Sequence, residues 1–214
     1  MTTILDPGAT PEALSINKIG IIGAGQMGAG IAHVAAITGI DVTVMDIGKQ
    51  QLEKALSTIQ QNLERQLKRE KITVNQMETA ISKLDQTIEY AGLSHCDLVI
   101  EAATEDESIK KTIYKDLIPT LTEKTVLASN TSSISITRLG ASTDRPEKFI
   151  GMHFMNPVPV MQLVEIIPGI ATNGTTHKIV EGLTYRLGKT PVVSEDFPAF
   201  IVNRILLPMI NEAV

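Results

Sequence analysis

The sequence predicts an α/β fold, in which a doubly wound, mostly parallel sheet carries helices on both faces. Short apolar segments alternate with longer segments of helical periodicity along the chain. A glycine-rich turn joins the first apolar segment to the first helical one, and an aspartate ends the next apolar segment. These observations indicate that the domain opens with a βαβ unit.

The composition narrows the functional classes. Apolar residues make up 43% of the 214 residues and charged residues 20%, which is typical of a globular protein. The formal net charge of −5 disfavours non-specific nucleic-acid binding, and no segment is apolar for long enough to span a membrane. Cys96 is the only cysteine, which excludes an intrachain disulfide and fits a cytoplasmic location.

The first segment differs from the rest. Residues 1–16 contain no Lys or Arg and no long apolar run, which argues against a secretory or transit peptide. Pro7, Gly8 and Pro11 interrupt regular structure there. We therefore expect a flexible tail over residues 1–16 and a folded domain over residues 17–197.

The first predicted unit is a strand, a helix and a second strand. Residues 18–22 are a short apolar strand, and residues 28–38 are an Ala-rich helix that Gly39 ends. Residues 41–45 are the second strand, with Asp46 at its end.

A helical hairpin is predicted next. Apolar residues recur at spacings of three or four from Leu52 to Leu67, as in an amphipathic helix. A second helix, running back, is predicted from Val74, Met77, Ile81 and Leu84. Because two successive helices interrupt the alternation of strands and helices, we interpret them as an insertion.

The alternation then resumes. Strands are predicted at residues 97–102, 125–128, 148–154, 162–167 and 191–193, and helices at 107–121 and 175–187. Asp196 and Pro198 are expected to open a last helix, within a separate region at residues 198–214.

A GxGxxG motif lies between the first strand and the first helix. In this context the first glycine permits a tight turn, the second lets the backbone approach a pyrophosphate, and the third allows close packing. A glycine-rich turn without a ligand is the alternative, which the order of strand, motif and helix disfavours. We predict a Rossmann-type dinucleotide site that includes Gly23, Gly25, Gln26, Met27 and Gly28.

Asp46 bears on the choice of dinucleotide. A carboxylate at the end of the second strand can accept hydrogen bonds from the ribose hydroxyls and repels a 2′-phosphate. No Arg follows it, although Lys49 is near, and capping of the next helix is the alternative role. The cofactor predicted is NAD rather than NADP.

His153 and Glu165 are the candidate catalytic pair. His153 ends one predicted strand and Glu165 lies in the next, so antiparallel pairing would let their side chains face each other. The carboxylate would fix one ring nitrogen and leave the other as a base, which hydride transfer from a secondary alcohol requires. From the spacing alone, a structural histidine with satisfied hydrogen bonds is the better interpretation. The histidines interpreted as structural or solvated are His33, His95 and His177.

Two polar clusters are open to two interpretations. Residues 129–133, SNTSS, follow a strand at the edge of the sheet where ligands bind, but they also fit a turn that caps a helix. Lys68, Arg69 and Lys71 end the long helix, either as a solvated face or as a phosphate contact for an anionic substrate.

Five segments carry a resemblance to a known family. They are GIIGAGQMGAGIAHVAA, LVIEAATED, LASNTSSISIT, GMHFMNPVPVMQLVEII and DFPAFIVNRILLPMINEA. They resemble the 3-hydroxyacyl-CoA dehydrogenases, and among these the bacterial 3-hydroxybutyryl-CoA dehydrogenases. The resemblance runs from about Ile16 to the last residue, and its HFxNPxPxMxLVE stretch is more specific than the glycine motif.

The resemblance implies a role for each matching residue. His153 is the implied base, Glu165 its orienting partner, and Ser132 and Asn203 contact the substrate, with Ser132 also near the cofactor. Contacts with the nicotinamide half are implied for Glu105, Lys110, Asn130 and Asn156, and Lys110 also lies near the substrate. Asn62 and Arg69 stand where the family often has Ser and Lys in contact with coenzyme A.

The implied reaction is reversible, NAD-dependent oxidation of a short-chain (S)-3-hydroxyacyl-CoA, as in fatty acid metabolism. The resemblance implies a homodimer for the full-length protein, and we expect no metal site. Because the family usually continues for about eighty residues as a helical domain, we expect that domain to be truncated here. Two alternatives remain: a related dehydrogenase of a small hydroxy acid, and an NAD-binding module with little activity.

Overall fold

The computed structural model describes residues 16–214 and contains a single eight-stranded sheet in that range. The strand order is β3-β2-β1-β4-β5-β6-β7-β8. All neighbouring pairs are parallel except β6 and β7, which are antiparallel. The predicted α/β class is confirmed, and its one antiparallel pair is the pair that carries His153 and Glu165.

Seven of the eight strands follow the predicted apolar segments, and β3 is the exception. They are β1 (Lys18–Ile22), β2 (Asp41–Met45), β3 (Leu84–Thr87), β4 (Leu98–Glu101), β5 (Val126–Ser129), β6 (Phe149–Phe154), β7 (Leu163–Pro168) and β8 (Thr190–Val193). The helices are α1 (Gln26–Ile37), α2 (Lys49–Lys68), α3 (Val74–Ser82), α4 (Glu107–Leu117), α5 (Ile136–Gly140), α6 (Gly174–Arg186) and α7 (Val202–Glu212).

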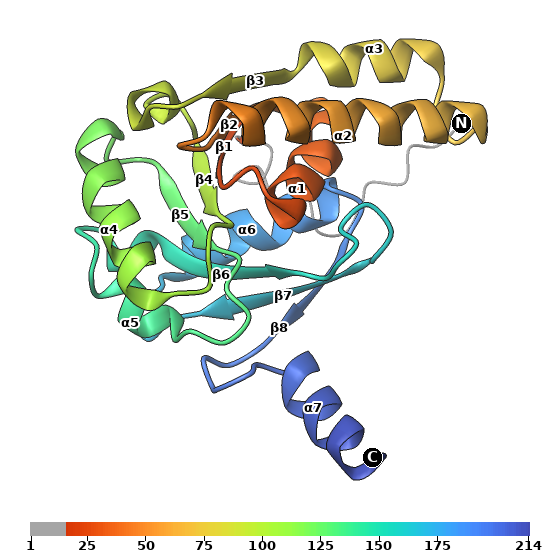
Figure 1. Cartoon of the computed structure of the whole chain (residues 1–214). Helices are drawn as coiled ribbons and strands as arrows, with labels where there is room; N and C mark the ends of the chain where they lie inside the picture. The colour runs from red at the N-terminus through yellow and green to blue at the C-terminus, as the bar shows by residue number, and fades with distance from the viewer. Residues whose placement is uncertain (1–15) are drawn as a thin grey trace, which may run out of the picture.

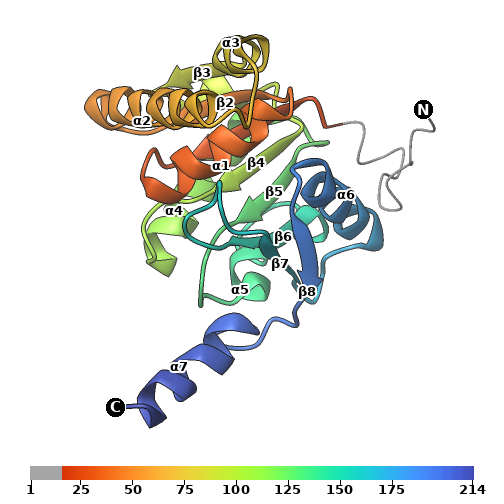
Figure 2. The same ribbon diagram turned by 90° about the vertical axis from the view of Figure 1, so that its right-hand side faces the viewer.

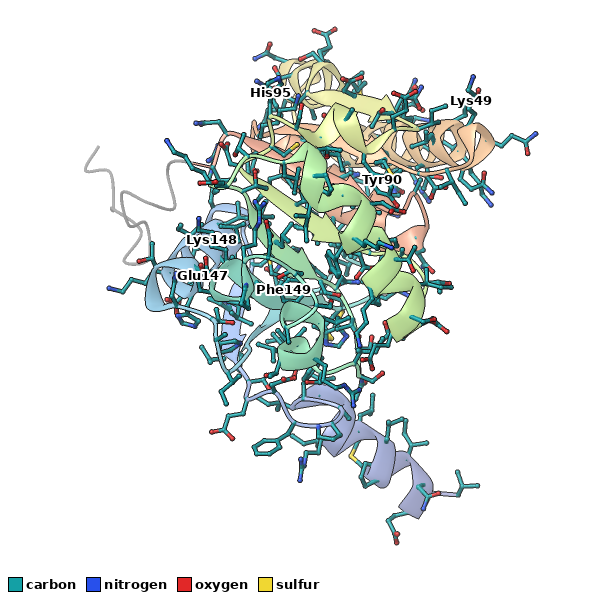
Figure 3. The ribbon with its side chains drawn as sticks, turned by 90° about the vertical axis from the view of Figure 1, so that its left-hand side faces the viewer. Lys49, Tyr90, His95, Glu147, Lys148 and Phe149 are labelled. Atoms are coloured by element: carbon teal, nitrogen blue, oxygen red, sulfur yellow. The ribbon has the colours of Figure 1, made fainter. Side chains whose placement is uncertain are left out.

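The sheet is covered on both faces, and each face has its own apolar core. Helices α1, α2, α3 and α6 pack on one face, and α4 and α5 on the other (Figures 1 and 2). On the second face, Phe149, labelled in Figure 3, meets the ring of Tyr114 edge to face, with centroids 5.1 Å apart. Helix α7 projects away from the sheet, and none of its residues is buried (Figures 1 and 2).

The predicted tail lies outside the described residues except for its last position. Ile16 is buried in the core on the α1 face, so the packed domain already includes this residue. In the described part of the chain, no helix is both long enough and apolar enough to cross a membrane.

Two predicted elements are corrected by the structure. Leu84 does not extend the second helix of the hairpin: α3 ends at Ser82, and Leu84 begins β3, which pairs with β2. The hairpin of α2 and α3 is therefore the crossover from β2 to β3. The 3-10 turn Ile118–Thr120 ends the predicted helix at residues 107–121, because Pro119 cannot continue the α-helix.

Asp196 was expected to open the last helix, and this is wrong. Its carboxylate instead accepts hydrogen bonds from the N–H groups of Ile136 and Thr137 and from the Ser135 hydroxyl, each at 2.8 Å. These groups form the first turn of α5, a helix too short for its periodicity to be detected. Asp196 thus caps a helix sixty residues earlier in the chain, and α7 begins only at Val202.

We predict that Asp196→Ala lowers the free energy of unfolding by about 1–3 kcal/mol, because two backbone N–H groups lose their acceptor. Chemical denaturation measures the change. Asp85→Ala is the matched control, since the Asp85 carboxylate is exposed and accepts a bond from the neighbouring Gln86 N–H. Equal stability of the two variants would contradict the capping role.

Candidate active site

The glycine motif forms the turn between β1 and α1, and its glycines meet different constraints. Gly23 has a φ of +103°, and a Cβ there would lie 2.6 Å from the Ala102 carbonyl oxygen. A Cβ at Gly28 would lie 1.8 Å from the Gly23 carbonyl oxygen. At Gly25 an added Cβ would meet no atom within 4 Å. The first and third glycines are thus required by the fold, whereas the second faces open space.

The N-terminus of α1 is suited to bind an anion. Its N-cap, Gly25, provides no side-chain hydrogen bond, and the first turn contains no acidic residue. A cavity of about 380 Å³ opens beside it, between Ala24, Gly25 and Gln26 on one side and α2 and the loop 156–159 on the other. Free N–H groups and the helix dipole favour a phosphate there, so the residues present fit the pyrophosphate of NAD.

Asp46 is anchored beside the glycine motif. One carboxylate oxygen accepts the Ala24 N–H at 2.8 Å, and the other accepts the Gly48 N–H at 3.0 Å. The side chain therefore stays at the end of β2, half-buried, where a ribose would be recognised. Its part in the choice of NAD over NADP remains a prediction.

Other predicted cofactor residues lie within the glycine motif and near the end of β6. Gln26 donates from its amide to the Asn156 side-chain oxygen at 3.0 Å, which joins the motif to the loop after β6. The Asn130 side chain accepts the Phe154 N–H at 2.9 Å, at the end of β6. Met27 packs against the core on the α1 face.

Glu105 organises the polar loop after β5. One of its carboxylate oxygens accepts hydrogen bonds from the Thr131 hydroxyl, the Ser132 N–H and both the N–H and the hydroxyl of Ser133. Burial alone would raise the pKa of Glu105, but these bonds and Lys110 outweigh it and hold the pKa below its usual value. Glu105 therefore remains an anion that fixes Ser132.

Sequence reasoning missed Glu101, the last residue of β4. It is fully buried and pairs with the equally buried Lys110 at 2.6 Å. It also accepts bonds from the Ser129 hydroxyl at 2.7 Å and the Ala103 N–H at 2.7 Å. Lys110 lies 3.6 Å from Glu105 as well. The signal available in the sequence was an acidic residue at the end of an apolar strand. The partners of Glu101 could not be predicted from it, because they lie in three other segments of the chain.

His153 and Glu165 face each other across β6 and β7, as predicted. The two residues are register partners, and His153 Nδ1 lies 2.6 Å from a Glu165 oxygen. His153 Nε2 lies 3.1 Å from the Ser132 hydroxyl. Both members of the pair are buried, with exposed fractions of 6% and 0%. A carboxylate, an imidazole and a hydroxyl therefore form one connected row.

Glu165 has a second set of partners. Its other oxygen accepts the N–H groups of Ile201 at 2.8 Å and Val202 at 2.9 Å, where α7 begins. Burial opposes ionisation, but hydrogen bonds from His153, Val202 and Ile201 outweigh it and lower the pKa of Glu165. The carboxylate is thus kept charged, and one of its oxygens is reserved for the imidazole.

The predicted substrate residues lie in three places, and one of them, Lys110, is buried against Glu101 and lines neither of the two cavities. Asn203 donates from its side chain to the Ser132 carbonyl oxygen at 3.4 Å, next to the imidazole row. Asn62 and Arg69 line a second cavity of about 350 Å³, between the end of α2 and the loop 157–160. Asn62 lines the first cavity too, so the two cavities adjoin. The cations Arg65, Arg69 and Lys71 line the second one.

The other histidines have different surroundings. Burial and the nearby Lys189 ammonium lower the pKa of His33 to about 4, and its Nε2 contacts the Gln66 side chain at 2.9 Å. His33 is therefore a neutral, structural side chain. His95 is exposed (Figure 3), and His177 is half-buried in α6.

Comparison with known proteins gives a consistent result. Residues 18–197 match the family model described as "3-hydroxyacyl-CoA dehydrogenase, NAD binding domain". The 3-hydroxybutyryl-CoA dehydrogenase of Bradyrhizobium diazoefficiens is 53% identical over 202 residues, which cover 94% of this chain and 69% of that protein. The fatty acid oxidation complex subunit alpha of Acinetobacter baylyi is 41% identical, over 90% of this chain and 27% of the subunit.

Solved structures agree with the sequence relatives. The crystal structure of (S)-3-hydroxybutyryl-CoA dehydrogenase from Ralstonia eutropha superposes with a TM-score of 0.91 at 48% identity. The superposition covers 93% of this chain and 70% of that one.

We predict that Gly25→Ala leaves the melting temperature unchanged but weakens NADH binding by about tenfold or more, because a methyl group would stand where the pyrophosphate approaches the backbone. Gly28→Ala is the contrasting variant. Its methyl group collides with the Gly23 carbonyl, so stability itself should fall by about 1–3 kcal/mol. Calorimetric titration and thermal melting separate the two effects, and equal behaviour of both variants would refute the distinction.

Cofactor choice gives a second prediction. Asp46→Ala should narrow the preference for NADH over NADPH, because it removes both the ribose acceptor and the repulsion of a 2′-phosphate. Titration of each dinucleotide against both proteins measures the ratio of affinities. If the unmodified protein binds the two dinucleotides equally, Asp46 does not set the preference.

Proposed function

The chain belongs to the NAD-dependent 3-hydroxyacyl-CoA dehydrogenase family, and we propose that it oxidises a short-chain (S)-3-hydroxyacyl-CoA reversibly to the 3-oxoacyl-CoA. The observation that supports this most directly is the row of Glu165, His153 and Ser132, joined by contacts of 2.6 and 3.1 Å. The glycine motif and Asp46 would hold NAD, which would supply the acceptor for the hydride of the carbinol carbon.

The row of Glu165, His153 and Ser132 provides an acceptor for the hydroxyl proton of the substrate. Glu165 is ionised and accepts the Nδ1–H of His153, which leaves Nε2 unprotonated and able to take a proton. Nε2 and the Ser132 hydroxyl lie side by side, so a substrate hydroxyl placed between them can bond to both. In the oxidation direction His153 receives the hydroxyl proton at Nε2, and in the reduction direction it returns it.

The choice of an acyl-CoA over a small hydroxy acid rests on the adjoining cavities. The cavity lined by Arg65, Arg69 and Lys71 shares the lining residues Asn62, Pro157 and Pro159 with the cavity beside the glycine motif, so the three cations lie next to the dinucleotide site without being part of it. A small hydroxy acid has no groups that would reach these cations, whereas the phosphates of coenzyme A would. Residues of the loop 157–160 line both cavities.

The proposal is tested by following NADH oxidation with acetoacetyl-CoA and with free acetoacetate. Turnover should require the coenzyme A ester. Efficient turnover of free acetoacetate would favour the small hydroxy acid dehydrogenase, and NADH binding without turnover of either would favour a binding module.

We expect His153→Gln to lower kcat by about a hundredfold or more, with NADH affinity nearly unchanged, because the base is lost while the glycine motif is intact. Glu165→Gln should have a similar effect. Its amide would donate to Nδ1, and the ring proton would then occupy Nε2, the atom that must accept. His95→Gln is the matched control, since His95 is exposed. Retention of most of kcat by His153→Gln would rule out this base.

A further inference from the structure

The turn between β8 and α7 has an unusual backbone. Ala199 and Phe200 are consecutive residues with φ values of +68° and +50°, a left-handed conformation that side chains other than glycine rarely adopt. Two such residues in succession persist only where the surrounding structure compensates for the strain. The contacts of this turn must therefore stabilise the left-handed conformation of both residues.

The main compensating contact is the burial of the Phe200 ring. Phe200 is 3% exposed and belongs to the same apolar core as Ile136 of α5 and Ile167 of β7. Its ring centroid lies 5.9 Å from that of His153, with the two ring planes tilted by 57°. Phe200 thus packs against the imidazole as well as against the core.

The same turn directs two backbone donors at Glu165. Directly after Phe200, the N–H groups of Ile201 and Val202 bond to one Glu165 oxygen, while His153 Nδ1 bonds to the other. Since both oxygens have partners, the carboxylate cannot rotate without breaking a bond on one side. The next residue, Asn203, reaches back to the Ser132 carbonyl.

We propose that Phe200 is a positioning residue for His153: its buried ring holds the left-handed turn in place, and the turn fixes Glu165 in the orientation that keeps the proton on Nδ1. The inference rests on the proposed role of His153 as the base. In this role Phe200 touches the imidazole without taking part in proton transfer. The role also accounts for the left-handed conformation of a bulky aromatic residue.

The arrangement also connects α7 with the base. Helix α7 projects from the sheet, and its first residue, Val202, is one of the two donors to Glu165 (Figures 1 and 2). A movement of α7 relative to the sheet would therefore be transmitted to the carboxylate, and from there to the imidazole.

The test compares Phe200→Ala with Phe197→Ala. Phe197 is a phenylalanine of the same turn, 56% exposed, so its truncation is a matched control. Nitrogen-15 NMR of the histidine ring reports which nitrogen carries the proton, and steady-state kinetics report kcat. For Phe200→Ala we expect a mixture of the two His153 tautomers and a kcat lowered by about tenfold or more, with NADH affinity within about twofold. Phe197→Ala should keep the single Nδ1–H tautomer and the kcat of the unmodified protein.

Phe200→Leu keeps most of the apolar volume and serves if Phe200→Ala does not fold. It should give smaller changes in the same two measurements. An unchanged His153 tautomer in Phe200→Ala would overturn the positioning role, even if stability or kcat fell. If only Phe200→Leu folds, the same result in that variant would overturn it. Failure of the proposed function is distinguishable, because it would appear as absent turnover by the unmodified protein while the tautomer comparison still held.

Discussion

A carboxylate buried away from water must be compensated on both of its oxygens, and Glu165 imposes this constraint on the whole site. Removing an ionised group from water costs several kcal/mol unless hydrogen bonds replace the lost hydration. The compensation comes from His153 on β6 and from the backbone that begins α7. The orientation of the imidazole and the start of α7 therefore depend on one side chain.

Glu101 is a second buried carboxylate of the site, and hydrogen bonds and an ion pair compensate its burial as well. It is buried at the end of β4, and its charge is balanced by Lys110 of α4 while its other bonds reach β5 and the segment after β4. Lys110 also faces Glu105, which holds Ser132 in place. The Ser132 hydroxyl and the imidazole of His153 meet at 3.1 Å. The imidazole is bonded directly to the buried Glu165, whereas Ser132 is held by the exposed Glu105, which Lys110 joins to the buried Glu101.

Much of the fold and of the candidate site could be predicted from the sequence, because these features depend on residues that are close together in the chain. Apolar runs gave the bounds of β1 and β2 to the residue, and the pairing of His153 with Glu165 follows from two adjacent strands and a short connection. Other features depend on partners far along the chain. Asp196 looks like a cap for the helix that follows it, but only the folded structure brings it to α5. Leu84 is followed by polar residues, because β3 is an edge strand with exposed positions that hide its periodicity.

The antiparallel pairing of β6 with β7 allows the cavities and the His153–Glu165 pair to evolve independently. His153 and Glu165 are held by strand register, while the loop 156–160 that joins their strands borders both cavities. Substitutions or changes of length in this loop can reshape the cavities without moving His153 from Glu165. The shape of the cavities and the pairing of His153 with Glu165 are therefore separable traits, and the first can diverge among descendants of one ancestor while the second stays the same.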